Sequence, residues 1–176
     1  MLRTPSGDRT RPTQARLRQA LLNSIQAELP GARVLDLFAG SGALGFESLS
    51  RGAEQVTFVE SSRAALTVMS ENAKALKVEN QITILNQTVE SLLSDRNFPG
   101  APFDIVFADP PYEKAWELKL LQDAPWEKWL SPQGLFCLEW GVQKSLVDEL
   151  PESVSGLLKR REKEYGDSVL TTYVRE

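Results

Sequence analysis

Histidine is absent from this chain of 176 residues, and cysteine occurs once, at Cys137. The absence of histidine excludes Ser-His-Asp triads, Cys-His nucleophile pairs and histidine-based metal sites. A single cysteine also excludes an internal disulfide framework and a structural zinc site, so we expect no metal. Because Cys137 lies within an apolar run, it is predicted to be a buried thiol that packs as a small hydrophobe.

Long apolar segments are also missing. No apolar run reaches the roughly 18 residues that cross a membrane, and the arginine-containing start lacks the apolar core of a secretion signal. We therefore expect a cytoplasmic protein with no membrane partner. With 176 residues and 41% apolar content, the chain fits one globular domain over residues 1–176. Nothing in the sequence suggests an association element, so we expect a monomer.

The net charge of −4 by itself argues against nucleic-acid binding, because such proteins usually carry a basic surface. The charge is unevenly distributed, however. Residues 1–18 carry five arginines against one aspartate, a net charge of +4 that leaves −8 for the rest of the chain. The sequence therefore predicts a basic arm joined to an acidic body. The five arginines are Arg3, Arg9, Arg11, Arg16 and Arg18.

Apolar periodicity predicts strands that alternate with helices. After an irregular basic arm over residues 1–12, we expect a helix that has Thr13 as its N-cap and runs to about Leu29. The strands expected after it are Arg33–Phe38, Gln55–Glu60, Ile82–Asn86, Phe103–Ala108 and Gly134–Glu139. The helical segments expected between and after them are Ala43–Arg51, Arg63–Leu76, Thr88–Leu93, Glu113–Leu130 and Gln143–Leu150. This alternation predicts an α/β protein with a doubly wound parallel sheet.

The end of the chain departs from this alternation. Val154–Tyr165 and Ser168–Val174 both have strand character, and Gly166-Asp167 between them is a turn dipeptide. We therefore expect an antiparallel C-terminal hairpin at the edge of a mostly parallel sheet.

A glycine-rich turn follows the first expected strand. Gly40, Gly42 and Gly45 have the G-x-G-x-x-G spacing ahead of a helix, and Glu60 ends the next strand. Such a turn lets a ligand approach the backbone closely, while the acidic residue can accept hydrogen bonds from both ribose hydroxyls of an adenosine. The spacing predicts the binding site of a nucleotide-like cofactor.

Asp36, at the end of the first strand, discriminates between cofactors. A dinucleotide would bring its pyrophosphate to this position, where a carboxylate would repel it. S-adenosylmethionine has no phosphate and carries a cationic ammonium and a sulfonium, so the same carboxylate favours it. We therefore predict S-adenosylmethionine, while the glycines alone would also allow a nicotinamide-dependent dehydrogenase. Thr88 and Val89 follow the third strand, where an adenine would be held.

The fourth expected strand runs into Asp109-Pro110-Pro111-Tyr112, the most specific motif in the chain. A base amine is a poor nucleophile because its lone pair is delocalised into the ring, so an enzyme must hold the amine in line with the methyl group. Asp109 can accept one N–H and the Pro110 carbonyl another, while Tyr112 offers a face on which the base stacks. Pro110 and Pro111 stiffen the turn. The motif predicts methyl transfer to a base amine, achieved mainly by positioning.

Taken together, these motifs resemble the RsmD-type 16S ribosomal RNA guanine-N2 methyltransferases over nearly the whole chain. The Arg-Pro-Thr-x-x-Arg-x-Arg stretch of that family is similar to residues Arg11–Arg18. The family's glycine-rich turn corresponds to Asp36–Gly45, and its Asp-Pro-Pro-Tyr tetrad to Asp109–Tyr112. Members usually begin with a basic strand pair ahead of the Arg-Pro-Thr stretch, whereas this sequence starts at Met1-Leu-Arg-Thr.

The resemblance implies a Rossmann-like class I methyltransferase with a seven-stranded, mostly parallel sheet. The implied reaction moves a methyl group from S-adenosylmethionine to the N2 amine of a guanine in 16S ribosomal RNA of the small ribosomal subunit. It also implies that Arg11 and Thr13 fold over the cofactor and that Arg16 and Arg18 face RNA, although a solvated helix start would equally explain exposed arginines. The predicted cofactor-binding residues are Asp36, Phe38, Gly40, Gly42, Gly45, Glu60, Thr88, Val89, Arg11 and Thr13.

Two other functions are compatible with these residues. An adenine-N6 DNA methyltransferase would use the same tetrad, but reading duplex DNA usually requires a recognition domain that 176 residues do not contain. A non-catalytic, cofactor-binding RNA module is disfavoured by the intact tetrad.

Overall fold

The computed structural model of the protein describes residues 12–95, 98, 100–111, 115–141 and 149–176. Its contacts divide the chain into two compact units, Met1–Val89 and Glu90–Glu176. Of the irregular arm expected over residues 1–12, residues 1–11 lie outside the described residues, as does most of the helical segment expected at Gln143–Leu150. The single domain over residues 1–176 stays a prediction. In the described part of the chain, no helix is both long enough and apolar enough to cross a membrane.

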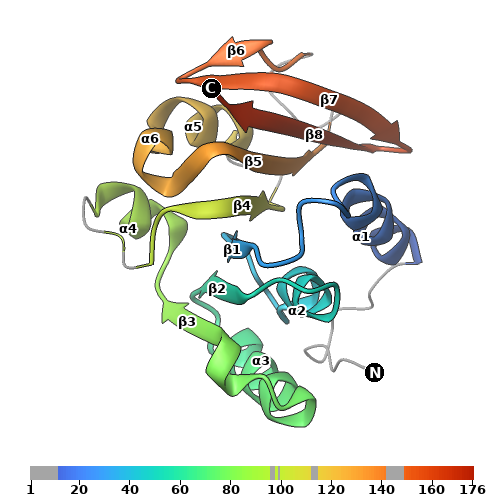
Figure 1. Ribbon diagram of the computed structural model, residues 1–176, viewed down its shortest axis with the longest axis vertical. Coiled ribbons are helices and arrows are strands. Elements are labelled where there is room, and N and C mark those ends of the chain that lie inside the picture. Colours follow the sequence, from blue (N-terminus) through green and yellow to red (C-terminus); the bar gives the residue numbers. More distant parts are fainter. Residues whose placement is uncertain (1–11, 96–97, 99, 112–114, 142–148) are drawn as a thin grey trace. The chain divides into compact units, whose positions relative to one another are not determined.

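The first unit is built on three parallel strands in the order β3-β2-β1 (Figure 1). β1 covers Arg33–Asp36, β2 covers Gln55–Glu60 and β3 covers Ile82–Asn86. Buried residues dominate β1 and β2, as is typical of parallel strands covered by helices. β2 and β3 have the predicted bounds. β1 ends two residues earlier than expected, because the chain turns there into the glycine-rich loop.

Helices accompany these strands in the first unit. They are α1 (Pro12–Ser24), α2 (Ala43–Ser50), α3 (Arg63–Leu76) and the short 3₁₀ helix η1 (Glu79–Gln81), which was not predicted. α2 packs on β1 and β2. α3 has the predicted bounds and is N-capped by Ser62, whose hydroxyl accepts a hydrogen bond from the Ala65 N–H.

α1 differs from its prediction at both ends. It begins at Pro12 rather than after an N-cap at Thr13, since the fixed φ of proline suits the first helical position and its missing N–H is not needed there. It ends at Ser24, whose hydroxyl donates to the Leu21 carbonyl oxygen at 2.7 Å and competes with continuation of the helix. The apolar residues that recur at helical spacing over the expected helix are nevertheless buried: Leu17, Leu21, Leu22, Ile25 and Leu29.

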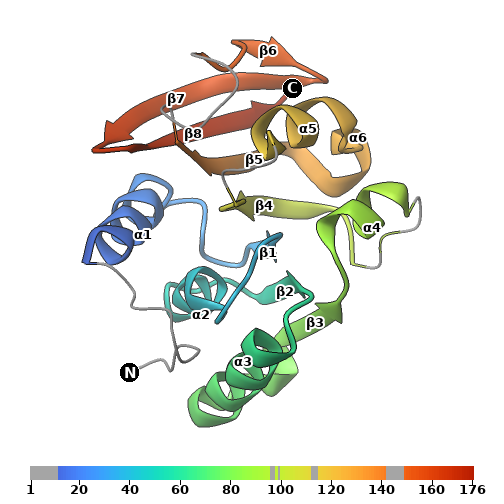
Figure 2. The same cartoon turned by 180° about the vertical axis from the view of Figure 1, so that it is seen from behind.

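The second unit contains five strands in the order β4-β5-β8-β7-β6 (Figures 1 and 2). β4 (Phe103–Ala108) pairs in parallel with β5 (Leu130–Trp140). β5 pairs antiparallel with β8 (Ser168–Arg175), and β8 with β7 (Leu157–Tyr165). The predicted antiparallel hairpin at the end of the chain is therefore confirmed.

The described residues form eight strands, one more than expected, because of the two-residue strand β6 (Ser153–Val154). Ser155 and Gly156 after it have φ angles of 51° and 78°. Two consecutive residues with positive φ form the turn that joins tightly paired antiparallel strands. The segment expected to form one strand from Val154 onward thus folds back on itself.

The second unit also contains α4 (Val89–Ser94), which begins at the last residue of the first unit, α5 (Trp116–Asp123) and α6 (Trp126–Trp129). One looser helix was expected over Glu113–Leu130. It is interrupted at Ala124, which has an extended ψ of 137° because the residue before a proline avoids the helical conformation. β5 consequently starts at Leu130, earlier than predicted. Cys137 within β5 is buried, as predicted.

Candidate active site

Glu60, at the end of β2, holds the glycine-rich turn of the first unit. Its Oε2 accepts a hydrogen bond from the Gly40 N–H at 2.8 Å. Its Oε1 accepts from the N–H groups of Ser61 at 2.8 Å and Ser62 at 2.7 Å. Three backbone donors therefore orient both carboxylate oxygens. Because a carboxylate oxygen can accept about two hydrogen bonds, Oε2 can serve a ribose hydroxyl in addition to Gly40.

The glycines of the turn are required for different reasons. A Cβ at Gly45 would lie 2.3 Å from Phe58 Cε1, so only glycine allows α2 to pack this closely on β2. A Cβ at Gly42, which has a φ of 80°, would lie 2.6 Å from Phe46 Cε2. At Gly40, with a φ of 53°, a Cβ would meet nothing within 4 Å. The turn is thus packed tightly at two glycines and open at Gly40, beside the Glu60 carboxylate.

Asn72 of α3 supports the same turn. Its side chain is 3% exposed and donates from Nδ2 to the Ser41 carbonyl oxygen at 3.3 Å. Sequence reasoning did not identify this residue. A signal was present, however, because Asn72 is a polar residue at the helical spacing of the buried positions Ala65, Met69 and Ala73.

Asp36 is buried at the carboxyl end of β1, with 4% of its surface exposed. The Gly45 N–H donates to its carboxylate, whereas Oδ2 has no hydrogen-bond partner among the described residues. Burial, together with the nearby negative charge of Glu60, raises the pKa of Asp36 to about 7, although the Gly45 hydrogen bond acts in the opposite direction. A buried oxygen of this kind is unfavourable unless a cation or a donor meets it.

The remaining predicted cofactor residues follow the same strand ends. Phe38 is half-buried after β1, while Thr88 is exposed and Val89 buried after β3. Because the three strands are parallel, Asp36, Glu60 and Thr88 all lie at the carboxyl edge of β1, β2 and β3. Arg11 lies outside the described residues, and Thr13 lies in the first turn of α1.

The tetrad lies in the second unit. Every residue of β4 from Ile105 to Ala108 is buried, and the next residue, Asp109, is exposed. Pro110 is buried and Pro111 exposed, while Tyr112 lies outside the described residues. Asp109 is thus an exposed acidic residue at the carboxyl end of a buried parallel strand, the end at which the sequence was expected to place it.

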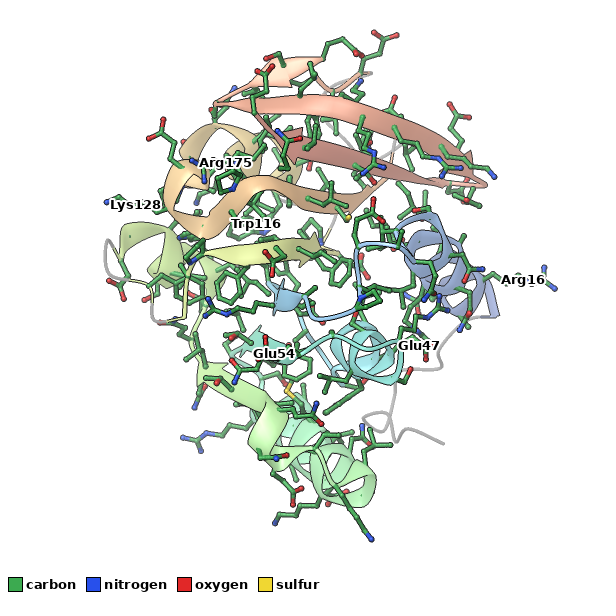
Figure 3. All side chains as sticks on the ribbon, in the orientation of Figure 1. Arg16, Glu47, Glu54, Trp116, Lys128 and Arg175 are labelled. Carbon is green, nitrogen blue, oxygen red and sulfur yellow. The ribbon has the colours of Figure 1, made fainter. Side chains whose placement is uncertain are left out.

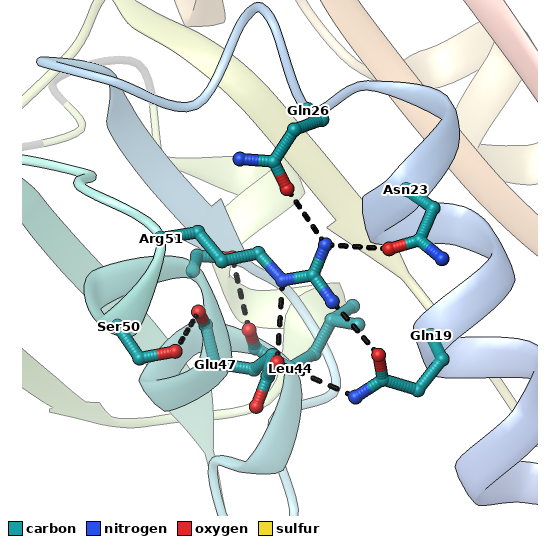
Figure 4. A network of polar contacts seen from close by, with 8 residues as sticks. Gln19, Asn23, Gln26, Leu44, Glu47, Ser50 and Arg51 are labelled. Atoms are coloured by element: carbon teal, nitrogen blue, oxygen red, sulfur yellow. Dashed lines mark hydrogen bonds and ion pairs between the residues drawn. The ribbon is translucent and has the colours of Figure 1, made fainter.

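Arg51 fastens α1 to α2 (Figure 4). Its Nη1 donates to Asn23 Oδ1 and Gln26 Oε1, and its Nη2 to Gln19 Oε1, each at 2.8 Å. Its Nε lies 3.2 Å from Glu47 Oε1 within α2. The guanidinium therefore joins the helix that follows the glycine-rich turn to the helix that carries the two predicted RNA-binding arginines.

Those two arginines differ in exposure. Arg16 is exposed and extends away from α1 (Figure 3), whereas Arg18 is half-buried. Their exposure is compatible with RNA binding and with an ordinary solvated helix start.

A glycine-rich turn and an acidic residue at successive parallel strand ends, with an antiparallel C-terminal hairpin, define a Rossmann-like methyltransferase. Ribosomal protein L11 methylase from Lactobacillus delbrueckii subsp. bulgaricus has the same fold, with a TM-score of 0.70. It is 22% identical, and the match covers 93% of this chain and 80% of that chain.

The chain belongs to the Conserved hypothetical protein 95 family, the RsmD family of methyltransferases, whose family model matches residues 1–174. Ribosomal RNA small subunit methyltransferase D of Escherichia coli (strain K12) is 34% identical, with 99% of this chain and 84% of that protein covered. The protein of the same name from Haemophilus influenzae is 33% identical, with coverages of 86% and 81%. A solved Escherichia coli structure, 33% identical, has a TM-score of 0.81 and coverages of 99% and 91%.

Proposed function

We propose that the protein transfers a methyl group from S-adenosylmethionine to the N2 amine of a guanine in 16S ribosomal RNA of the small ribosomal subunit. The names of the Escherichia coli and Haemophilus influenzae relatives, ribosomal RNA small subunit methyltransferase D, support ribosomal RNA as the substrate. On this substrate the enzyme acts in the cytoplasm, where ribosomal subunits are assembled, and we propose that it acts as a monomer.

The observation that carries the choice of cofactor is the buried Asp36 carboxylate, whose Oδ2 has no hydrogen-bond partner among the described residues. A pyrophosphate beside this group would add a second negative charge, whereas an ammonium or sulfonium would compensate the first. The space beside Gly40 is open next to the Glu60 carboxylate. The carboxylates of Glu60 and Asp36 therefore suit a ribose next to a cationic amino acid moiety. Phe38, Thr88 and Val89, together with Arg11 and Thr13, complete the proposed cofactor set.

The proposed reacting residues are those of the tetrad. When bound, S-adenosylmethionine supplies a methyl group whose S–C bonding pair stays on sulfur while the lone pair of the amine nitrogen forms the new bond. Asp109 and the Pro110 carbonyl accept the two N–H groups and hold the amine, and Tyr112 stacks on the guanine. The methylated nitrogen then loses one proton. Because Asp109 is exposed, that proton can pass through its carboxylate to water.

The test is nucleoside analysis of small ribosomal subunits. Subunits from a strain without this methyltransferase family are incubated with the protein and methyl-labelled S-adenosylmethionine, digested and analysed by mass spectrometry. Labelled N2-methylguanosine is expected. Labelled N6-methyladenosine would overturn the proposed base, and RNA without label would overturn the proposed reaction.

A further inference from the structure

A β-bulge in β7 determines which of its charged residues lie on each face of the sheet. Pairing of β7 with β8 shifts register between Lys159 and Arg161. Beyond this point the residues pair one to one with β8 as far as Tyr165. Because side chains alternate along a strand, Arg161, Lys163 and Tyr165 share one face, and Glu162 and Glu164 share the other. We call Arg161, Lys163 and Tyr165 the β7 stripe.

The glutamate face is the one that carries the aromatic core of the unit. Glu162 Oε2 accepts a hydrogen bond from the Thr171 hydroxyl at 2.7 Å, and Thr171 Oγ1 in turn accepts from Trp140 Nε1 at 2.9 Å. Phe136 lies on the same face of β5 as Trp140, and its ring centroid is 4.3 Å from that of Trp126 in α6. The β7 stripe therefore lies on the face opposite to α6.

The stripe presents two cations and an aromatic ring. Arg161 and Lys163 are exposed and Tyr165 is half-buried. Lys163 Nζ lies 5.1 Å from the centroid of the Tyr165 ring, so the cation and the ring are adjacent. Lys163 pairs with Leu170 of β8, and Leu170 pairs with Glu139 of β5, which therefore lies on the same face as the stripe. Glu139 is half-buried and accepts a hydrogen bond from the Ser168 hydroxyl at 3.1 Å.

We propose that the β7 stripe is a second contact surface for the RNA substrate, in addition to the basic arm. This inference rests on the proposed function, since it concerns the same substrate. The chain after residue 18 carries a net charge of −8. It therefore repels the phosphate backbone of RNA except where positively charged side chains lie close together. Arg161 and Lys163 bind phosphates, and Tyr165 stacks on an unpaired base.

The experiment compares the full chain with the double variant Arg161→Gln/Lys163→Gln. A matched control, Lys74→Gln/Lys77→Gln, removes two exposed positive charges from α3 and its C-cap. The dissociation constant for unmethylated small subunits and for naked 16S RNA is measured over a series of salt concentrations. For the stripe variant we expect about tenfold weaker binding and a slope of log affinity against log salt reduced by about 1.4. The control and the affinity for S-adenosylmethionine should be unchanged.

Tyr165 is tested separately from the charges. Tyr165→Phe keeps the ring and should bind like the unmodified protein, whereas Tyr165→Ala should weaken binding about tenfold. Unchanged binding and salt slope in the stripe variant would overturn the inference while methylation by the unmodified protein still supports the proposed function. Weaker binding to subunits with normal binding to naked RNA would also overturn it, because the stripe would then contact ribosomal protein. If the unmodified protein binds RNA in a stripe-dependent way but methylates no guanine, the proposed function fails and the RNA contact stands.

Discussion

The Gly40 N–H donates to Glu60 Oε2 at 2.8 Å, which ties the turn after β1 to the end of β2, 20 residues further along the chain. The same carboxylate accepts the Ser61 and Ser62 N–H groups through its other oxygen. One side chain thus shapes the turn and the start of α3. In the proposed function the same carboxylate would also accept a hydrogen bond from a ribose hydroxyl, so we expect a change at this residue to affect both the turn and cofactor binding.

Glu60→Gln should therefore weaken cofactor binding and not only remove a charge. The amide replaces one acceptor oxygen with an NH₂ group, which faces either Gly40 or the Ser61 and Ser62 donors. We expect a loss of about 2 kcal/mol, or roughly thirtyfold in the dissociation constant of S-adenosylmethionine, measured by isothermal titration calorimetry. The exposed Glu54→Gln is the control with the same chemical change. Equal affinities for the two variants would contradict this role of Glu60.

Because folding raises the pKa of Asp36, the free energy of unfolding should decrease as the pH rises. Its pKa rises from 3.8 to about 7 on folding, so its favourable contribution is complete below pH 3.8 and lost as the pH rises through 7. Asp36→Asn removes this loss, worth about 4 kcal/mol, but leaves a buried amide N–H group to satisfy. Relative to the unmodified protein, the free energy of unfolding of the variant in urea should rise by about 2.6 kcal/mol between pH 5 and pH 8.

The same variant provides the control for the cofactor. In the unmodified protein, S-adenosylmethionine affinity should increase about tenfold from pH 6 to pH 8 as Asp36 ionises, and Asp36→Asn should remove that increase. A pH profile that is identical in the two proteins would show that Asp36 does not face the cation.

Gly45→Ala should destabilise the protein because the added Cβ would collide with two side chains of β2, Phe58 and, at 2.7 Å from its Cγ1, Val56. The new Cβ would lie 2.3 Å from Phe58 Cε1, so we expect a loss of about 1–3 kcal/mol of unfolding free energy in urea denaturation. Phe58→Leu in the same chain shortens the opposing side chain and should recover part of that loss. If the loss of unfolding free energy in the double variant equals the sum of the losses in Gly45→Ala and Phe58→Leu, then the collision with Phe58 does not cause the destabilisation.

Arg51→Lys should loosen α1 while preserving charge. A lysine has three donors on one nitrogen and cannot reach Gln19, Asn23, Gln26 and Glu47 together as the guanidinium fork does. We expect a loss of about 1–2 kcal/mol in unfolding free energy and faster amide hydrogen exchange in α1. The exposed Arg63→Lys is the matched control. Unchanged amide hydrogen exchange in α1 of the Arg51→Lys variant would show that the Arg51 contacts do not hold α1 in place.

Asp109→Ala tests the proposed reaction centre. Because the residue is exposed at the end of a buried strand, its removal should leave the fold intact. Methyl transfer to small subunits should fall below detection. The dissociation constant of S-adenosylmethionine should differ by less than about fivefold from that of the unmodified protein. If the Asp109→Ala variant still labels the subunits, another group must hold the amine.

The sequence by itself determined the elements whose signals are local. β2, α3, β3 and β4 have their predicted bounds because each depends on periodicity within the segment and on the turn residues at its ends. The split between α5 and α6 was not predicted, although its signal, the proline after Ala124, is also local. The glycine spacing and the tetrad were visible for the same reason, since their chemistry is written in consecutive residues.

Only the tertiary structure decided which distant residues meet. The Asn72 contact with Ser41 joins residues 31 positions apart, and the Arg51 contacts reach back 25 to 32 positions. Packing likewise leaves the Asp36 oxygen Oδ2 without a hydrogen-bond partner in the part of the chain that the structure describes. A single bulge in the pairing of β7 with β8 decides which β7 charges share a face. Spacing along a chain reports local geometry, whereas burial and side-chain partnership arise only when separate elements pack against one another.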